Sequence, residues 1–187
     1  MDVTAFFAHL DWGPFTLLSL FFQNYAYSLV AILSLALAPY LRKRGRYYAL
    51  AVSMVLIIVL SFLLKDAYFI PRPCNDWLSD AKACTPQEDY GFPSGHTAFA
   101  FVFVAAALGT RIFPFFLATG IIIGLSRVYL GIHSIGDVAG GAALGVLTYL
   151  FVEEIVDWAG RKLEPPASPK ESCVRLRKTH KKERCGG

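Results

Sequence analysis

Three short polar blocks interrupt an otherwise apolar chain, and their residue types together suit phosphate chemistry. The blocks are Lys65-x6-Arg72-Pro73, Pro93-Ser94-Gly95-His96 and Ser126-Arg127-x5-His133-x3-Asp137. They supply three cations, two imidazoles, one carboxylate and a Ser-Gly turn. Fixed cations and hydrogen-bond donors stabilise the oxygens of a phosphoryl group, while one imidazole attacks phosphorus and another protonates the leaving oxygen. The blocks therefore predict a site for phosphoryl transfer.

The third block carries the nucleophile in this interpretation. His133 and Asp137 are four residues apart, so one helical turn brings their side chains together. Asp137 then fixes the imidazole tautomer and leaves the other ring nitrogen of His133 free to act. Arg127 lies six residues before His133, where its guanidinium can form a bidentate hydrogen bond to a phosphate. A purely structural His–Asp pair at the end of a helix is the alternative explanation of this spacing.

The first and second blocks are expected to bind the phosphate and to supply the acid. Ser94 is a favourable N-cap and Gly95 permits close approach of the backbone, so the start of the following helix favours an anion. His96 projects from the first turn of that helix as the general acid. Lys65 and Arg72 add two cations, although a lysine at a helix end can also extend to the membrane interface and an arginine can be solvated.

We expect the site to work without a metal ion or any other cofactor. The three blocks contain no cluster of carboxylates of the kind that holds a divalent cation. Cys173, His180 and Cys185 could form a zinc site in the C-terminal tail, but their spacing is unusual and a fourth ligand is missing. Cys74 and Cys84 could form a disulfide if their loop faces an oxidising compartment.

The composition places these blocks in a membrane protein. Of 187 residues, 55% are hydrophobic and 17% are charged, with a net charge of +4 and a mean hydropathy of +0.47. A water-soluble domain carries more charge. A bilayer core about 30 Å thick needs roughly 20 apolar residues per helix. Five stretches meet or approach that length: 15–38, 47–64, 94–110, 112–129 and 136–156. The expected fold is therefore an all-α bundle of five membrane-spanning helices.

The distribution of positive charge predicts the orientation of this bundle. The tail from Arg161 onward holds nine of the eighteen Lys and Arg residues, and four more crowd the link between the first two spans: Arg42, Lys43, Arg44 and Arg46. Positive charge favours the cytoplasmic side. The N-terminus is then outside, the C-terminus is cytoplasmic, and all three blocks meet on the outer face.

Three regions are expected along the chain. Residues 1–13 lack the basic start of a cleavable signal peptide and form an interfacial N-terminal helix. Residues 14–160 form the transmembrane domain, with an outer loop over 71–93. Residues 161–187 form a basic cytoplasmic tail that is flexible. Glycines spaced four apart, as at Gly141 and Gly145, predict close helix packing within one subunit or between two.

The three blocks resemble, position by position, the signature of the type 2 phosphatidic acid phosphatase superfamily. The resemblance covers about Tyr47 to Trp158, and no motif position is substituted. It implies a metal-independent phosphatase that forms a phosphohistidine intermediate, with His133 as nucleophile, Asp137 as its orienting partner and His96 as general acid. The residues it assigns to phosphate binding are Lys65, Arg72, Ser94, Gly95 and Arg127. Many membrane members have six spans, one more than the five expected here.

We therefore expect an integral protein of the cell membrane that removes phosphate from a lipid. Compact family members that resemble bacterial undecaprenyl pyrophosphate phosphatases have a similar length, so a polyprenyl diphosphate is the preferred substrate. Phosphatidic acid, phosphatidylglycerol phosphate and phosphoryl transfer to another hydroxyl are the alternatives within this class. A non-catalytic carrier of anionic lipids is the rival of another class. Membrane lipids are the expected surroundings, and nucleic acid is not an expected partner.

Overall fold

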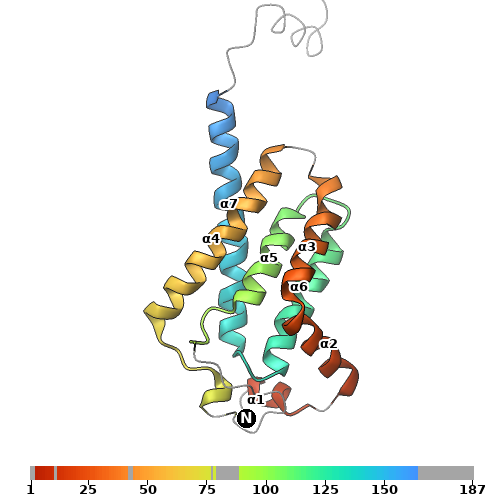
Figure 1. Ribbon diagram of the computed structural model, residues 1–187, viewed down its shortest axis with the longest axis vertical. Helices are drawn as coiled ribbons and strands as arrows, with labels where there is room; N and C mark the ends of the chain where they lie inside the picture. Colours follow the sequence, from red (N-terminus) through yellow and green to blue (C-terminus); the bar gives the residue numbers. More distant parts are fainter. Residues whose placement is uncertain (1–2, 11, 42–43, 77, 79–88, 164–187) are drawn as a thin grey trace, which may run out of the picture.

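The computed structural model describes residues 3–10, 12–41, 44–76, 78 and 89–163, which form a bundle of helices (Figure 1). None of these residues forms a strand, so the all-helical prediction is confirmed for this part of the chain. The C-terminal tail beyond residue 163 and residues 77 and 79–88 of the outer loop lie outside the described residues. So do the members of both expected cysteine groupings other than Cys74: Cys84, Cys173, His180 and Cys185.

Two helices are long and apolar enough to cross a membrane. They are α4 (Arg44–Tyr68) and α7 (Ile135–Leu163). The apolar helices α5 (Gly95–Ala106) and α6 (Phe113–Tyr129) match the expected spans over 94–110 and 112–129 but are shorter. At 1.5 Å per residue they rise only about 18 Å and about 26 Å. By length and composition the described residues contain two spans, or three with the bent pair below, and the expected five remain a prediction.

The first expected span, over 15–38, is two helices rather than one. Helix α2 (Gly13–Asn24) and helix α3 (Ala26–Leu37), which leads into the 3-10 turn η1 (Ala38–Tyr40), meet at an angle of 87°. The short helix α1 (Val3–Ala8) precedes them. Helix α2 turns away because it packs on the end of α6, where the hydroxyls of Thr16 and Tyr129 lie 2.7 Å apart. The sequence of this stretch, which contains no charged residue, does not predict such a bend.

Helix α5 lies at the centre of the bundle and is buried along most of its length. It packs against α3, α4, α6 and α7 (Figure 1). Gly141 and Gly145 of α7 face its backbone so closely that a Cβ atom at Gly145 would overlap the carbonyl oxygen of Ala98. Small residues permit this approach. The predicted close packing therefore occurs within one chain, between α5 and α7.

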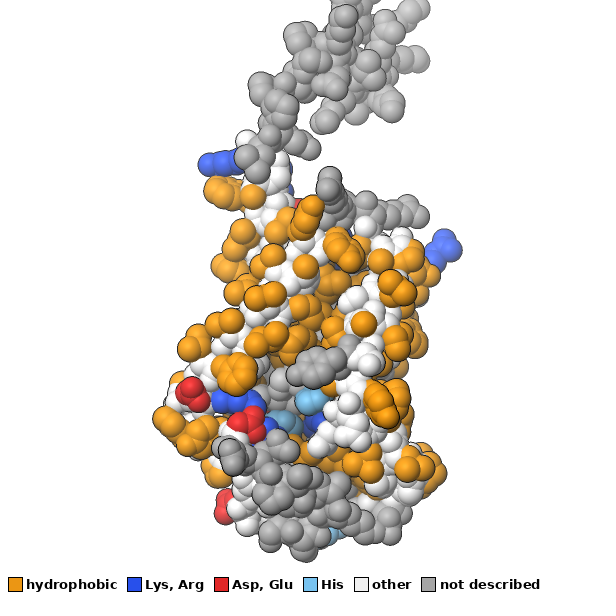
Figure 2. All heavy atoms as spheres, viewed as in Figure 1, with side chains coloured by type: hydrophobic (Ala, Val, Ile, Leu, Met, Phe, Trp, Pro, Cys, Tyr) orange, Lys and Arg blue, Asp and Glu red, His pale blue; other side chains and the backbone are white. Residues whose placement is uncertain are grey.

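The outside of the bundle is apolar, as a lipid-facing surface requires. Hydrophobic side chains cover much of the face in Figure 2, charged side chains lie toward its two ends, and the histidines lie toward the lower one. Leu35 and Phe151, for example, are 79% and 66% exposed. Exposed apolar surface on this scale marks contact with a membrane or another partner.

Candidate active site

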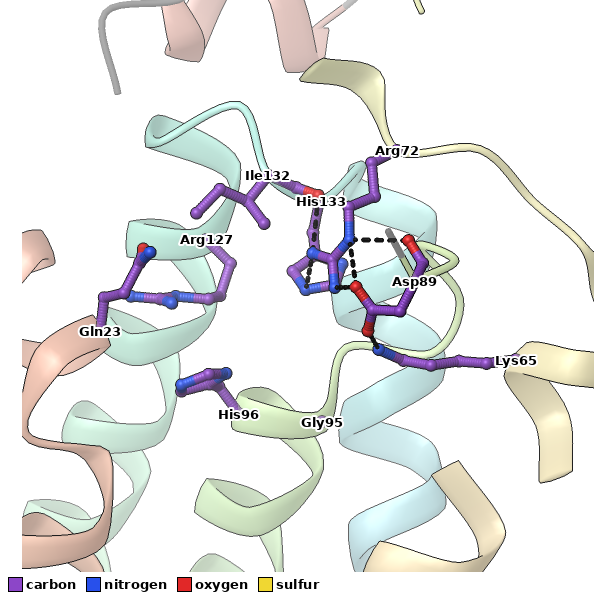
Figure 3. A pocket seen from close by; sticks show the side chains of 9 residues that line it. All are labelled: Gln23, Lys65, Arg72, Asp89, Gly95, His96, Arg127, Ile132 and His133. Atoms are coloured by element: carbon purple, nitrogen blue, oxygen red, sulfur yellow. Dashed lines mark hydrogen bonds and ion pairs between the residues drawn. The ribbon is translucent and has the colours of Figure 1, made fainter. Parts of the chain in front are cut away.

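The three sequence blocks meet at one end of the bundle. Helices α4 and α6 end there, and α5 and α7 begin there (Figure 1). Between them lies a cavity of about 290 Å³ (Figure 3). Six of the eight expected site residues line it, and the other two, Ser94 and Asp137, do not. The full lining is Gln23, Lys65, Arg72, Asp89, Gly95, His96, Arg127, Ile132 and His133.

His133 is held by a tight turn between α6 and α7. Gly131 has a φ of +67°, a conformation that glycine adopts at little cost, and it reverses the chain directly after α6. The backbone N–H groups of Ile132 and His133 both donate to the carbonyl oxygen of Arg127, at 3.3 Å. The His133 side chain is buried at the cavity wall, with 3% of the residue exposed. The turn therefore fixes the imidazole relative to the end of α6.

The contacts of the His133 ring define its tautomer. Nη1 of Arg72 lies 3.2 Å from Nε2 of His133. A guanidinium has donors and no acceptor, so Nε2 must accept with its lone pair and Nδ1 must carry the proton. Burial, opposed by the nearby Asp137 and reinforced by the charge of Arg72, lowers the pKa of His133 to about 4. At neutral pH the ring is thus uncharged and presents a basic nitrogen to the cavity.

Asp137 lies next to His133, and hydrogen bonds at the start of α7 hold its carboxylate in place. Its Oδ2 accepts a hydrogen bond of 2.7 Å from the backbone N–H of Ser134, and the Ser134 hydroxyl accepts one of 3.1 Å from the N–H of Asp137. This reciprocal arrangement is a helix-capping box. The same Oδ2 lies 3.6 Å from Nδ1 of His133, longer than a hydrogen bond. Asp137 is therefore placed to attract the Nδ1 proton.

Arg127 and His96 form another part of the cavity wall (Figure 3). Arg127 is almost fully buried, and its guanidinium donates to the Ser126 hydroxyl at 3.3 Å and to the Ser19 carbonyl at 3.1 Å. Both acceptors are neutral, so the positive charge of Arg127 is not cancelled by these partners. His96 lies on the first turn of α5 and shares the cavity with His133, although the two come from different parts of the chain.

Ser94 and Gly95 take different places at the start of α5. Ser94 occupies the N-cap position, but its side chain makes no capping bond and instead accepts a hydrogen bond of 3.0 Å from the Thr97 hydroxyl. Its backbone N–H donates to the Asp137 carbonyl at 3.0 Å, which joins α5 to α7. Gly95 lines the cavity, and a Cβ atom there would meet nothing within 4 Å. The expected phosphate contact of the Ser94 side chain stays a prediction.

Two polar lining residues, Asp89 and Gln23, were not expected from the sequence. The Asp89 carboxylate forms ion pairs with both Lys65 and Arg72, with 2.6 Å between its Oδ1 and Nη2 of Arg72. Gln23 comes from the end of α2, and its Oε1 is buried with no hydrogen-bond partner among the described residues. Asp89 is one of several acids in a polar loop, and no spacing rule separates it from the others. The sequence contains one indication of Gln23: it is a polar amide within an apolar stretch that contains no charged residue.

A second and larger cavity adjoins the first. It has a volume of about 640 Å³ and is lined mostly by apolar side chains of α3, α4 and α5, such as Ile58 and Phe99. The two cavities share five lining residues: Gln23, Lys65, Asp89, Gly95 and His96. A polar pocket thus opens into an apolar one at the level of His96.

The described residues contain no group of three or more His, Cys, Asp and Glu side chains that could hold a metal ion. Three cations line the cavity: Lys65, Arg72 and Arg127. The chemistry available to these residues is therefore charge stabilisation by fixed donors, with two imidazoles for attack and proton transfer.

Comparison with known proteins connects this geometry to a family. The family model of the PAP2 superfamily matches residues 46–161, well over half of the chain. Human sphingosine-1-phosphate phosphatase 2 is 33% identical over 125 residues, which cover 59% of this chain and 30% of that protein. Phosphatidylglycerophosphatase B of Bacillus subtilis is 35% identical over 80 residues, 36% of this chain and 39% of that protein. The matches thus span about a third of each relative's length.

A solved structure shares the fold over most of its length. The crystal structure of Aquifex aeolicus LpxE superposes with a TM-score of 0.66 at 26% sequence identity. The superposition covers 81% of this chain and 93% of that one.

Proposed function

The chain belongs to the PAP2 superfamily, and we propose that it is a metal-independent phosphatase that acts on a lipid phosphate. One observation carries this proposal: the basic Nε2 of His133 faces a cavity whose wall also holds three cations and a second imidazole. These groups together suit one type of ligand, a terminal phosphoryl group whose leaving oxygen must be protonated.

The proposed reaction has two steps. In the first, Nε2 of His133 forms a bond to phosphorus, the bond from phosphorus to the leaving oxygen breaks, and His96 gives that oxygen its proton. The leaving oxygen belongs to the lipid in a phosphate monoester and to the inner phosphate in a diphosphate. In the second, water attacks phosphorus, His96 takes a proton from it, and inorganic phosphate leaves His133. Asp137 stabilises the positive charge that develops on the ring, as the carboxylate of a Ser-His-Asp triad does for its imidazolium.

The cations stabilise the phosphoryl group during both steps. Lys65, Arg72 and Arg127 surround the cavity that would receive its oxygens, and Arg72 already contacts the nucleophilic nitrogen at 3.2 Å. The amide of Gly95 at the start of α5 adds a donor at the positive end of a helix dipole. Such preorganised charge stabilises the transition state without the reorganisation that water would need.

The adjoining apolar cavity supports a lipid as the group that carries the phosphate. A phosphate bound at His133 would have its leaving oxygen near His96, where the polar cavity opens into the apolar one. A hydrocarbon chain could continue from there between α3, α4 and α5. The names of the two relatives, a sphingosine-1-phosphate phosphatase and a phosphatidylglycerophosphatase, agree with a phosphorylated lipid.

Within this class we put a polyprenyl diphosphate first. Lys65 and Gln23 line both cavities, so a cation and an amide donor stand where a second phosphate would lie between the reacting phosphate and the tail. Phosphatidic acid and phosphatidylglycerol phosphate are the alternatives. The cluster of cations at the opposite end of α4 and α7 supports an active site on the extracytoplasmic side of the cell membrane.

Phosphate release from a panel of lipids tests this proposal. The purified protein, in detergent with EDTA, is offered prenyl diphosphates, phosphatidic acid, phosphatidylglycerol phosphate and sphingosine 1-phosphate. We expect release of inorganic phosphate from at least one of them without added metal. A second arm adds a lipid or sugar hydroxyl as acceptor, and a phosphorylated acceptor would identify a phosphotransferase. Release of no phosphate from any lipid would favour a non-catalytic carrier.

A bulky side chain in the apolar cavity should separate tail binding from chemistry. Ile58 of α4 lines this cavity, whereas the adjacent Val59 does not, although both are about half exposed. We expect Ile58→Trp to raise KM for long-chain lipid phosphates roughly tenfold, because a filled pocket costs about 1–3 kcal/mol. Hydrolysis of a short-chain, water-soluble phosphate ester should be unchanged.

Val59→Trp is the matched control for Ile58→Trp, since it adds the same ring to the same helix outside the cavity. We expect it to leave both KM values as they are. Equal effects of the two substitutions on the long-chain substrate would show that the cavity does not receive the tail.

A further inference from the structure

Asp89 places a carboxylate among the cations of the phosphate site (Figure 3). Its Oδ2 pairs with Nζ of Lys65, and its Oδ1 accepts hydrogen bonds from Nη2 and Nε of Arg72 at 2.6 Å and 3.1 Å. One carboxylate thus engages two of the three cations that line the cavity, through two different oxygens. A phosphate bound to the same two cations would use two of its oxygens in the same way.

The backbone of Asp89 is anchored beside the site while its side chain remains accessible. The Asp89 carbonyl accepts a hydrogen bond of 3.2 Å from Nε of Arg72, and the N–H of Gly91 donates to the Ile70 carbonyl at 2.8 Å. The ring of the neighbouring Tyr90 packs edge-on against Phe69, with 5.1 Å between the ring centroids. The Asp89 side chain itself is 46% exposed. It can therefore turn toward solvent by rotation about its own side-chain bonds.

Asp89 carries its charge at neutral pH. Partial burial raises the pKa of Asp89, but the hydrogen bond from Lys65 and the charge of Arg72 outweigh it and hold that pKa below its usual range. A phosphate and the Asp89 carboxylate cannot share the same two cations, because two anions in contact repel each other strongly.

We propose that the Asp89 carboxylate is an internal anion that competes with the substrate phosphate, and with the phosphate product, for Lys65 and Arg72. This inference rests on the proposed function, since it assigns the same two cations to the phosphate. The carboxylate swings outward when a phosphate binds and returns to the cations when inorganic phosphate leaves.

Such a competitor lowers the affinity for every anion at this site by the same factor, since each ligand must first displace the same carboxylate. Uniform weakening of binding leaves the chemical step unchanged. Its benefit lies in the release of inorganic phosphate, which three unopposed cations would otherwise retain.

Direct binding of inorganic phosphate to Asp89→Asn tests the proposal. Asparagine keeps the size and an acceptor oxygen but removes the competing charge. We expect the Kd of phosphate, measured by titration calorimetry on the full chain in detergent, to fall roughly threefold to tenfold. The inhibition constants of phosphate and vanadate against lipid hydrolysis should fall by the same factor. Asp89→Ala should change all three in the same direction.

Asp66→Asn is the matched control, because it removes the same charge one residue after Lys65 from an exposed position outside the cavity lining. We expect no more than a small change in the Kd of phosphate. Weaker or unchanged phosphate binding in both Asp89 variants would overturn the proposal and make Asp89 a residue that merely positions Lys65 and Arg72. If the variants bind phosphate more tightly but neither they nor the wild type hydrolyse any lipid, the competition stands and the proposed function fails.

Discussion

We expect His133→Ala to reduce the rate of phosphate release at least about 10³-fold, the loss typical for removal of a covalent nucleophile. The neutral imidazole presents Nε2 to the cavity, and no other described lining residue combines an uncharged basic nitrogen with direct contact to Arg72. The measurement is release of inorganic phosphate under single-turnover conditions, with the lipid substrate identified by the panel. In parallel, a radiolabelled substrate should leave acid-labile label on the wild-type protein and none on the variant.

His9→Ala is the control for this substitution, because His9 is exposed and lies outside the cavity lining. We expect wild-type rates from it. Since His133 is buried, retained helical circular dichroism and thermal stability must accompany the loss of activity. A folded His133→Ala protein with a rate within tenfold of the wild type would refute covalent catalysis at this position.

The sequence located most of the cavity wall because the relevant signals are short-ranged. Lys65 at the end of one apolar stretch, Gly95 and His96 at the start of another, and His133 just beyond a third must lie near the ends of helices. Helices that alternate in direction bring the end of one and the start of the next to the same end of a bundle, and the charge distribution predicts which side of the membrane that end faces. Convergence on one cavity follows from topology, without knowledge of any tertiary contact.

Contacts between distant segments could not be predicted in the same way. Asp89 pairs with Lys65 across 24 positions and with Arg72 across 17, and the loop offered several equivalent acids. The Ser94 hydroxyl accepts a hydrogen bond from Thr97 where both side chains are fully buried and α5 packs on α7, and no pattern in the sequence indicates this pairing. The sharp bend at Tyr25 likewise depends on the packing of α2 against α6. These three features depend on the tertiary packing of segments that are distant in the sequence, and no local pattern specifies that packing.

The packing of α5 on α7 connects the fold to the proposed chemistry. His96 is carried by α5, whereas Asp137, the partner of His133, is carried by α7. The spacing between the two helices therefore sets the position of the proposed acid relative to the proposed nucleophile. That spacing depends on glycines at the contact and on the hydrogen bond from the Ser94 N–H to the Asp137 carbonyl.

We therefore expect Gly145→Ala to impair both stability and activity, although the residue lies away from the cavity. A Cβ atom at this position would overlap the carbonyl oxygen of Ala98, a backbone atom that cannot move aside as a flexible side chain would. Relief requires α5 and α7 to separate, and overpacking of this kind costs about 1–3 kcal/mol. At about 2–4 °C per kcal/mol for a chain of this size, the Tm should fall by up to about 10 °C.

Gly160→Ala is the matched control for Gly145→Ala, since it makes the same change on the same helix where a Cβ atom meets nothing within 4 Å. Alanine favours helix over glycine, so its Tm should be unchanged or slightly higher. The activity of Gly145→Ala below its own Tm separates packing from chemistry: a displaced His96 lowers kcat, whereas a purely thermal defect leaves kcat intact. An unchanged Tm and an unchanged kcat together would mean that the α5–α7 contact is looser than the glycines indicate, and that the position of His96 is set by other contacts.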